Sequence, residues 1–203
     1  GLGLGGERRE ITILFVEVRP FNRFPPALAP HEMTDHLNLH LTVGADAIHK
    51  FAGLIDKFMG NEIMGLFNTQ LNPDPYHAWN AVQAGLMLAD EFARLLADLG
   101  EEPIPYHTIG IHTGIATVGN VGSQTRREFT AIGDSVNLAK RLQENAQPGQ
   151  IIISGYTRQH CEPRLSDPAS GIQLIELPSV QVKGRREATT VYEIRRAQPV
   201  RER

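Results

Sequence analysis

The order of strand and helix signals is the feature of this sequence that most restricts its fold. The first strand signal is β-branched and mostly apolar, which is typical of a buried central strand. An amphipathic helix follows, then two short strands joined by a Gly-Asn turn, a second long helix and another strand. These elements are predicted at residues 11–18, 31–50, 54–59, 62–67, 75–98 and 107–118. The βαββαβ order predicts an α+β fold with a ferredoxin-like core, in which helices cover an antiparallel-rich sheet.

The C-terminal half adds further αβ elements to this core. Their signals lie at residues 129–142, 151–153, 154–160, 172–178 and 189–195. The first six residues match the G-x-G-x-x-G spacing, but they precede a strand instead of following one, so a linker is favoured over a dinucleotide site. Because the chain lacks an initiator Met, we expect a segment of a longer protein. Its predicted parts are a linker from an upstream region at 1–7, one domain at 8–196 and a tail at 197–203.

Composition excludes several classes of protein. With 203 residues, 41% of them hydrophobic, the chain can bury one sizeable core. A net charge of -3 argues against a dedicated binder of nucleic acid polymers, which usually carries a basic stripe. No apolar run approaches the ~20 residues that span a bilayer, and no signal peptide is visible. The single cysteine, Cys161, fits a reducing compartment. We therefore expect a cytoplasmic location and no membrane contact by this segment.

Two pairs of polar residues are spaced for one face of a helix. Asn137 and Arg141 are four residues apart, and an amide beside a guanidinium suits an anionic, oxygen-rich ligand. The alternative is an amphipathic helix with a solvated Arg. His36 and His40 share the same spacing and could hold a metal ion, but a partly buried or solvated pair is favoured because no third ligand lies nearby in the sequence.

Five segments, taken in order, resemble the catalytic domain of class III adenylyl/guanylyl cyclases. The resemblance covers about residues 7–195, nearly the whole chain. The matching segments are Leu14–Phe21, Asp56–Asn61, Gly110–Gly114 with Val118–Gly122, Phe129–Leu142 and Val182–Gly184. The resemblance implies conversion of ATP to cyclic AMP and pyrophosphate in intracellular signalling, with active sites at the interface of a head-to-tail dimer. It also implies an upstream sensor domain in the full-length chain.

The resemblance assigns roles to residues that would handle the nucleotide. Asn137 would orient the ribose, Arg141 would stabilise charge on the α-phosphate, and Lys183 would contact the terminal phosphates. Lys57 would donate to a ring nitrogen of adenine, and the Thr130 hydroxyl would accept from its exocyclic amine. Guanylyl members usually have Glu and Cys at the last two positions, so this pair predicts selectivity for ATP.

The positions that resemble the family's metal site depart from its pattern. Two Asp residues hold two Mg²⁺ ions in the family, whereas this chain has Glu17 and Asn61. Glu17 is one methylene longer, Asn61 has no charge, and Mg²⁺ demands near-ideal octahedral geometry. Glu62 is not expected to replace Asn61, since neighbouring strand residues point to opposite faces. We therefore expect a weakened two-metal site that works better with Mn²⁺.

The loop that would cradle the phosphates is altered as well. Its predicted contacts are Val18, Phe21 and Asn22, and Pro20, which lies between them in the loop, offers no backbone N–H. The expected enzyme is therefore weak on its own as a homodimer, and it could instead act in a heterodimer with a metal-competent cyclase domain. The alternative is a catalytically degenerate domain that binds nucleotide or dimerises to regulate a partner. A palm-type polymerase or diguanylate cyclase relative is disfavoured by the spacing of Asn137 and Arg141 and by Lys183-Gly184.

Overall fold

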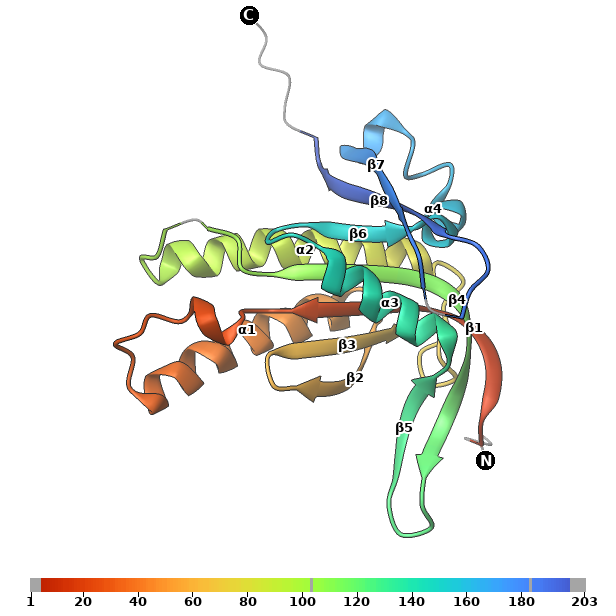
Figure 1. Cartoon of the computed structure of the whole chain (residues 1–203), viewed down its shortest axis with the longest axis horizontal. Helices are drawn as coiled ribbons and strands as arrows, with labels where there is room; N and C mark the ends of the chain where they lie inside the picture. Colours follow the sequence, from red (N-terminus) through yellow and green to blue (C-terminus); the bar gives the residue numbers. More distant parts are fainter. Residues whose placement is uncertain (1–4, 103, 183, 198–203) are drawn as a thin grey trace, which may run out of the picture.

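The computed structural model describes residues 5–102, 104–182 and 184–197, which form an eight-stranded sheet covered by helices (Figure 1). The strands are β1 Glu7–Glu17, β2 Leu54–Met59, β3 Glu62–Phe67, β4 Thr108–Gly122, β5 Arg127–Ile132, β6 Ile151–Ser154, β7 Ile172–Val180 and β8 Thr189–Arg196. The α-helices are α1 Pro30–Lys50, α2 His77–Asp98, α3 Asp134–Asn145 and α4 Gly155–Cys161, with short 3-10 helices at Phe21–Arg23 and Pro168–Ser170. The predicted α+β fold with a ferredoxin-like core is confirmed.

Strand pairing explains where the elements differ from the predicted ranges. The order in the sheet is β2-β3-β1-β4-β6-β8-β7, with β5 paired to β4. The central strands β1 and β4 are antiparallel and begin or end several residues beyond the apolar runs that revealed them. Glu7 of β1, for example, pairs with Val118 of β4. Backbone pairing therefore extends these strands through polar residues, which the hydrophobic pattern does not detect.

The alternation of side chains along β1 separates two cores. Leu14 and Val16 pack with residues of α1 and α2 on one face of the sheet. Ile13 and Phe15 belong to a second cluster on the other face, which includes Ala131 of β5 and Ala139 of α3. Figure 1 shows α3 lying across one face of the central strands, with α1 and α2 on the opposite face. The face covered by α3 and β5 carries the predicted nucleotide-handling residues.

The position of α3 depends on a close approach to β4 at Gly110. A Cβ atom at this position would lie 2.3 Å from the backbone nitrogen of Gln143 and 2.6 Å from the carbonyl oxygen of Ala139. The side chain of Gln143 also donates to Thr108 Oγ1 over 2.7 Å. Because only glycine permits this packing, the sheet fixes where the outer face of α3 is presented.

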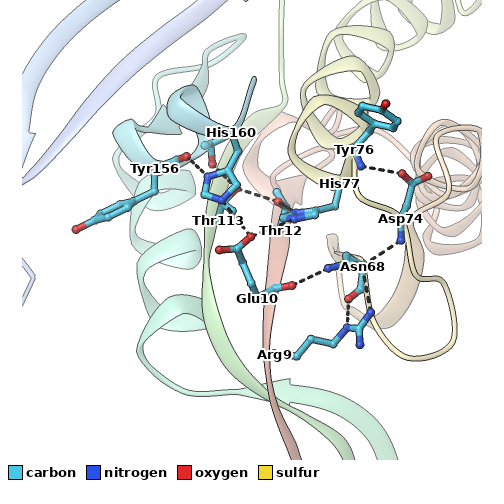
Figure 2. A network of polar contacts seen from close by, with 11 residues as sticks. Arg9, Glu10, Thr12, Asn68, Asp74, Tyr76, His77, Thr113, Tyr156 and His160 are labelled. Atoms are coloured by element: carbon cyan, nitrogen blue, oxygen red, sulfur yellow. Dashed lines mark hydrogen bonds and ion pairs between the residues drawn. The ribbon is translucent and has the colours of Figure 1, made fainter. Parts of the chain in front are cut away.

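A polar network holds α2 and α4 against the central strands (Figure 2). The hydroxyl of Thr12 lies 2.7 Å from His77 Nδ1 and 2.8 Å from the hydroxyl of Thr113. Glu10 Oε1 lies 3.0 Å from His160 Nε2 and 3.4 Å from His77 Nε2. These contacts join two helices to two strands, so we interpret the network as structural.

His36 and His40, the histidine pair noted in the sequence, contact each other within α1. His40 is buried, and its Nδ1 lies 2.7 Å from the carbonyl oxygen of His36. Across the described ranges, no three His, Cys, Asp or Glu side chains group closely enough to hold a metal ion. None of the helices in the same ranges combines the length and apolar character needed to span a bilayer.

Two buried histidines predict how stability depends on pH. Burial lowers the pKa of His107 to about 4 and, together with the charge of Arg185, the pKa of His112 to about 3, from an ordinary value of 6.5. The unfolded chain binds these protons near pH 6.5, whereas the folded chain does not. The contribution of these two neutral histidines to the free energy of unfolding is therefore fully present above about pH 6.5. It is lost on acidification, by about 2 kcal/mol per histidine at pH 5.

Urea unfolding between pH 7.5 and 5 measures this loss. In His107→Leu the fall in unfolding free energy should be smaller by roughly one histidine's share, because one proton-binding group is gone. His31→Ala serves as the control, since it removes an imidazole that is 77% exposed instead of a buried one. An identical pH slope in the parent and in His107→Leu would contradict the assignment.

Candidate active site

A β-bulge in β2 shapes the first part of the candidate site. Ile55 pairs with Gly65 of β3, and Lys57 pairs with Met64, so Asp56 is an extra residue between two pairs. A bulge changes the direction of the side chains beside it. As a result Asp56 Oδ2 and Lys57 Nζ approach to 3.8 Å, although the two residues are neighbours in a strand.

The predicted base-contacting residues meet at this bulge. Thr130 of β5 donates its hydroxyl proton to Asp56 Oδ2 over 2.6 Å. Thr130 is buried, the Asp56 side chain is 1% exposed, and the Lys57 side chain is 36% exposed. Burial raises the pKa of Asp56, while the hydrogen bond from Thr130 and the charge of Lys57 act to lower it. The structure thus brings Lys57 and Thr130 together through Asp56, a residue for which the sequence predicted no role.

The outer face of α3 forms the second part of the site. Asn137 and Arg141 are both exposed on this helix, one turn apart. They line a cavity of about 440 Å³ together with Lys140, Glu144, Gln181 and Val182. The predicted phosphate contact Lys183 lies outside the described residues. Its neighbour Val182 brings the chain to the cavity that Asn137 and Arg141 line.

The predicted metal position Glu17 faces α3 and lies opposite a second carboxylate. Glu17 pairs directly with Glu62 across β1 and β3, so both side chains point to the same face. Lys140 of α3 forms an ion pair with Glu62 and lies 5.6 Å from the ring centroid of Phe15. Burial and the charge of Glu62 raise the pKa of Glu17, and Lys140 opposes them. An internal ammonium group therefore already balances this acidic pair.

The second predicted metal position, Asn61, turns towards the loop after β1. Its side-chain nitrogen donates to the carbonyl oxygen of Arg19 over 3.0 Å, and its backbone oxygen accepts from Val18 N–H over 2.9 Å. An amide that donates to a carbonyl offers no negative charge to a cation. Lys140 on the carboxylate side and the use of Asn61 in the loop both reduce the negative charge that these residues present to a cation.

The loop after β1 is anchored by Arg19, a residue for which the sequence predicted no role. Arg19 is completely buried, lies 2.9 Å from Glu101 in an ion pair and donates to the carbonyl oxygen of Arg23 over 3.0 Å. Its guanidinium lies between the rings of Phe24 and Tyr106, with centroids 4.7 Å and 4.5 Å away. An Arg between apolar and proline residues was the only signal, and it does not distinguish a buried anchor from a solvated side chain.

The predicted phosphate-loop residues differ in what they can offer. The N–H of Val18 is used by the carbonyl of Asn61, and Pro20 has no N–H. Phe21 and Asn22 are exposed and begin the 3-10 helix Phe21–Arg23. In this arrangement Phe21 and Asn22 remain the candidates for backbone contacts to phosphate.

The sequence matches a described family and several curated proteins. Residues 6–195 match the adenylate and guanylate cyclase catalytic domain. An adenylate cyclase of Anabaena cylindrica is 35% identical over 191 residues, covering 92% of this chain and 37% of that protein. The terminal-differentiation specific adenylate cyclase of Dictyostelium discoideum is 31% identical over 189 residues, covering 92% of this chain and 9% of that protein. The chain therefore spans well under half the length of these relatives.

Solved structures agree with this match in fold. The adenylyl cyclase CyaB from P. aeruginosa superposes with a TM-score of 0.79 and 29% identity, covering 93% of this chain and 95% of that one. The guanylyl cyclase Cya2 gives a TM-score of 0.77 and 32% identity, covering 97% and 98%. Since one is an adenylyl and the other a guanylyl cyclase, overall likeness does not choose the base. The family match extends over nearly the whole chain, and the chain belongs to the class III adenylate and guanylate cyclase catalytic domains.

Proposed function

We propose that this domain converts ATP to 3′,5′-cyclic AMP and pyrophosphate, slowly by itself, at an interface between two cyclase domains. The observation that carries the proposal is the cluster of Lys57, Asp56 and Thr130, which combines a donor with a hydroxyl able to accept. The names of the Anabaena and Dictyostelium relatives support the adenylyl reaction. We place the domain in the cytoplasm, within a longer protein that carries a sensor region.

Each residue of the site would perform a distinct step in handling ATP. Lys57 would donate to a ring nitrogen, and Thr130 would accept from the exocyclic amine. The Asn137 amide would hold the ribose so that its 3′-oxygen attacks the α-phosphate and releases pyrophosphate. Arg141 would place a fixed positive charge where negative charge develops on that phosphate, which is commonly a large catalytic contribution. Lys183 would bind the terminal phosphates.

The exposed face of α3 explains why a second domain is required. Cyclase domains of this family act as dimers and depend on divalent metal ions. Asn137 and Arg141 point outwards, while Glu17 and Glu62 face the inner side of α3, where Lys140 balances them. The α3 face would therefore complete a site whose metal-binding half belongs to a partner, either a second copy or another cyclase domain.

Metal dependence tests the proposal directly. Purified alone, the domain should form cyclic AMP far more slowly with Mg²⁺ than the ~1 s⁻¹ or more typical of enzymes. Mn²⁺ should increase the rate, since Mg²⁺ is the stricter of the two in ligand geometry. An Arg141→Ala preparation, which should lose the activity, controls for contaminating cyclases. Rapid Mg²⁺-dependent turnover by the parent would show that the metal positions are not impaired.

The altered metal positions favour a second candidate function. Because Asn61 and Lys140 reduce the negative charge that these residues present to a cation, the domain could bind nucleotide or dimerise without catalysis and regulate a partner. Equilibrium binding of ATP with and without Mg²⁺ separates the two functions. A pure binder should hold ATP with little dependence on metal, whereas a weak enzyme should bind it more tightly when the cation is present.

A further inference from the structure

Asp56 is a buried carboxylate located between the two residues proposed to contact the base. Its Oδ2 accepts the Thr130 hydroxyl proton over 2.6 Å and lies 3.8 Å from the ammonium nitrogen of Lys57. Its side chain is 1% exposed, so water does not compete for these contacts. The bulge between Ile55 and Lys57 turns the carboxylate towards β5, on which Thr130 lies.

The hydrogen bond to Asp56 fixes the direction of the Thr130 hydroxyl. A hydroxyl carries one proton and two lone pairs, and an ionised carboxylate can only accept. The proton therefore points to Asp56, and Thr130 presents lone pairs to a group on its other side. Lys57, an ammonium, can only donate. The pair thus offers one donor and one acceptor in a fixed arrangement.

Adenine and guanine differ in the pattern that this arrangement would meet. Adenine carries an amine donor at the position where guanine carries a carbonyl acceptor. A Thr130 hydroxyl held as an acceptor complements the amine and opposes the carbonyl. Without Asp56 the hydroxyl could rotate and donate to the carbonyl, because a free hydroxyl serves either role.

We propose that Asp56 is a positioning residue that determines base specificity, because it holds the Thr130 hydroxyl as an acceptor and thereby selects ATP over GTP. The inference rests on the proposed function, since it concerns the same nucleotide site. It extends that function by giving the preference for adenine a source outside the two residues that touch the base.

Competition between the two nucleotides tests the proposal. Equimolar ATP and GTP are supplied in one tube with Mn²⁺, and the ratio of cyclic AMP to cyclic GMP gives the ratio of the two kcat/KM values. The background is the chain with Glu17→Asp and Asn61→Asp, beside the unaltered chain. The two dissociation constants, measured by equilibrium dialysis, give a separate measure of the preference that needs no turnover. A ratio within one preparation is independent of the folded fraction, so a loss of stability does not mimic the effect.

Asp56→Ala should reduce the preference for ATP by about 10-fold or more, the usual effect of leaving a buried polar group wrongly paired. Asp56→Asn should restore part of the preference, because its amide oxygen can still accept from Thr130. In a Thr130→Val background, Asp56→Ala should change the ratio no further, since the hydroxyl that it orients is absent. Asp46→Ala removes an exposed carboxylate of α1 and is the charge-matched control.

The outcomes separate this inference from the proposed function. If the parent uses or binds ATP but Asp56→Ala keeps its preference within about threefold, less than the cost of one mispaired polar group, Asp56 does not determine specificity. The inference also fails if Asp56→Ala still changes the ratio in the Thr130→Val background, or if Asn gives no rescue. If neither background binds or converts ATP, the proposed function itself is wrong and the inference fails with it.

Discussion

Placing aspartate at both predicted metal positions, Glu17→Asp together with Asn61→Asp, is expected to raise Mg²⁺-dependent cyclic AMP formation by about 100-fold or more. Even indirect changes around metal ligands alter affinity or activity by about 10- to 100-fold, and this change affects the proposed ligands themselves. At position 17 the shorter aspartate side chain would bring its carboxylate nearer the strand. At position 61 an aspartate would supply the negative charge that the amide lacks.

The structure also shows what the double change must overcome. Asn61 donates to the carbonyl oxygen of Arg19, and a carboxylate there would face that oxygen unless a cation lies between them. Without metal, the restored chain should therefore be less stable than its parent, and added Mg²⁺ should recover stability in proportion to its binding. Thermal unfolding with and without Mg²⁺ measures this recovery separately from catalysis.

The control for the restored chain carries the same chemical changes at the surface. Glu32→Asp with Asn38→Asp alters two exposed residues of α1 and should leave the activity at the parent level. If the restored chain gains nothing, Lys140→Ala is added, because the ammonium of Lys140 beside Glu62 would repel an incoming cation. A triple variant without increased activity would refute the view that the metal positions limit the parent, and would direct attention to Pro20.

The elements of this fold follow closely from the sequence because each depends on a local signal. The hairpin of β2 and β3 and the helix α1 lie within a residue of their predicted ranges, since turn chemistry and apolar spacing define both. Placement of Asn137 and Arg141 on one exposed face also follows from helical periodicity. These features need no knowledge of what packs against them.

The remaining features of the site depend on tertiary contacts between distant segments. The bulge at Asp56 appears only when β2 pairs with β3, and its bond to Thr130 joins residues 74 positions apart. Likewise the alignment of Glu62 with Glu17 follows from the register of β1 and β3, and its ion pair with Lys140 follows from the position of α3. Periodicity gives the face on which a side chain lies, but not the residue that it meets there.

Mixing two differently impaired forms of this chain should reconstitute an active site between subunits. The first form carries Glu17→Asp, Asn61→Asp and Arg141→Ala, so it has the metal positions but lacks the α3 guanidinium. The second is the unaltered chain, which has Arg141 on an exposed helix face and poor metal positions. In a symmetric dimer each site takes one half from each subunit. A mixed dimer therefore contains one site with both halves intact.

The expected activity follows from the statistics of pairing. With random exchange, half of the dimers are mixed and one of their two sites is complete, so the mixture should reach about a quarter of the doubly restored chain's activity. The activity of each form alone should be about 10²- to 10³-fold lower than that of the doubly restored chain, which is the usual effect of losing a positioned charge in the transition state. Cyclic AMP production is measured after the two forms have been incubated together long enough to exchange subunits.

A matched change in the second form identifies the residue responsible. Arg141→Ala there should abolish the activity of the mixture, whereas Arg94→Ala, which removes a 71% exposed guanidinium from α2, should leave it unchanged. If the mixture stays active without Arg141 in either form, the guanidinium does not act at the site. If mixing gives no gain although the doubly restored chain is active, both halves of each site come from one subunit, and the exposed face of α3 does not serve a partner.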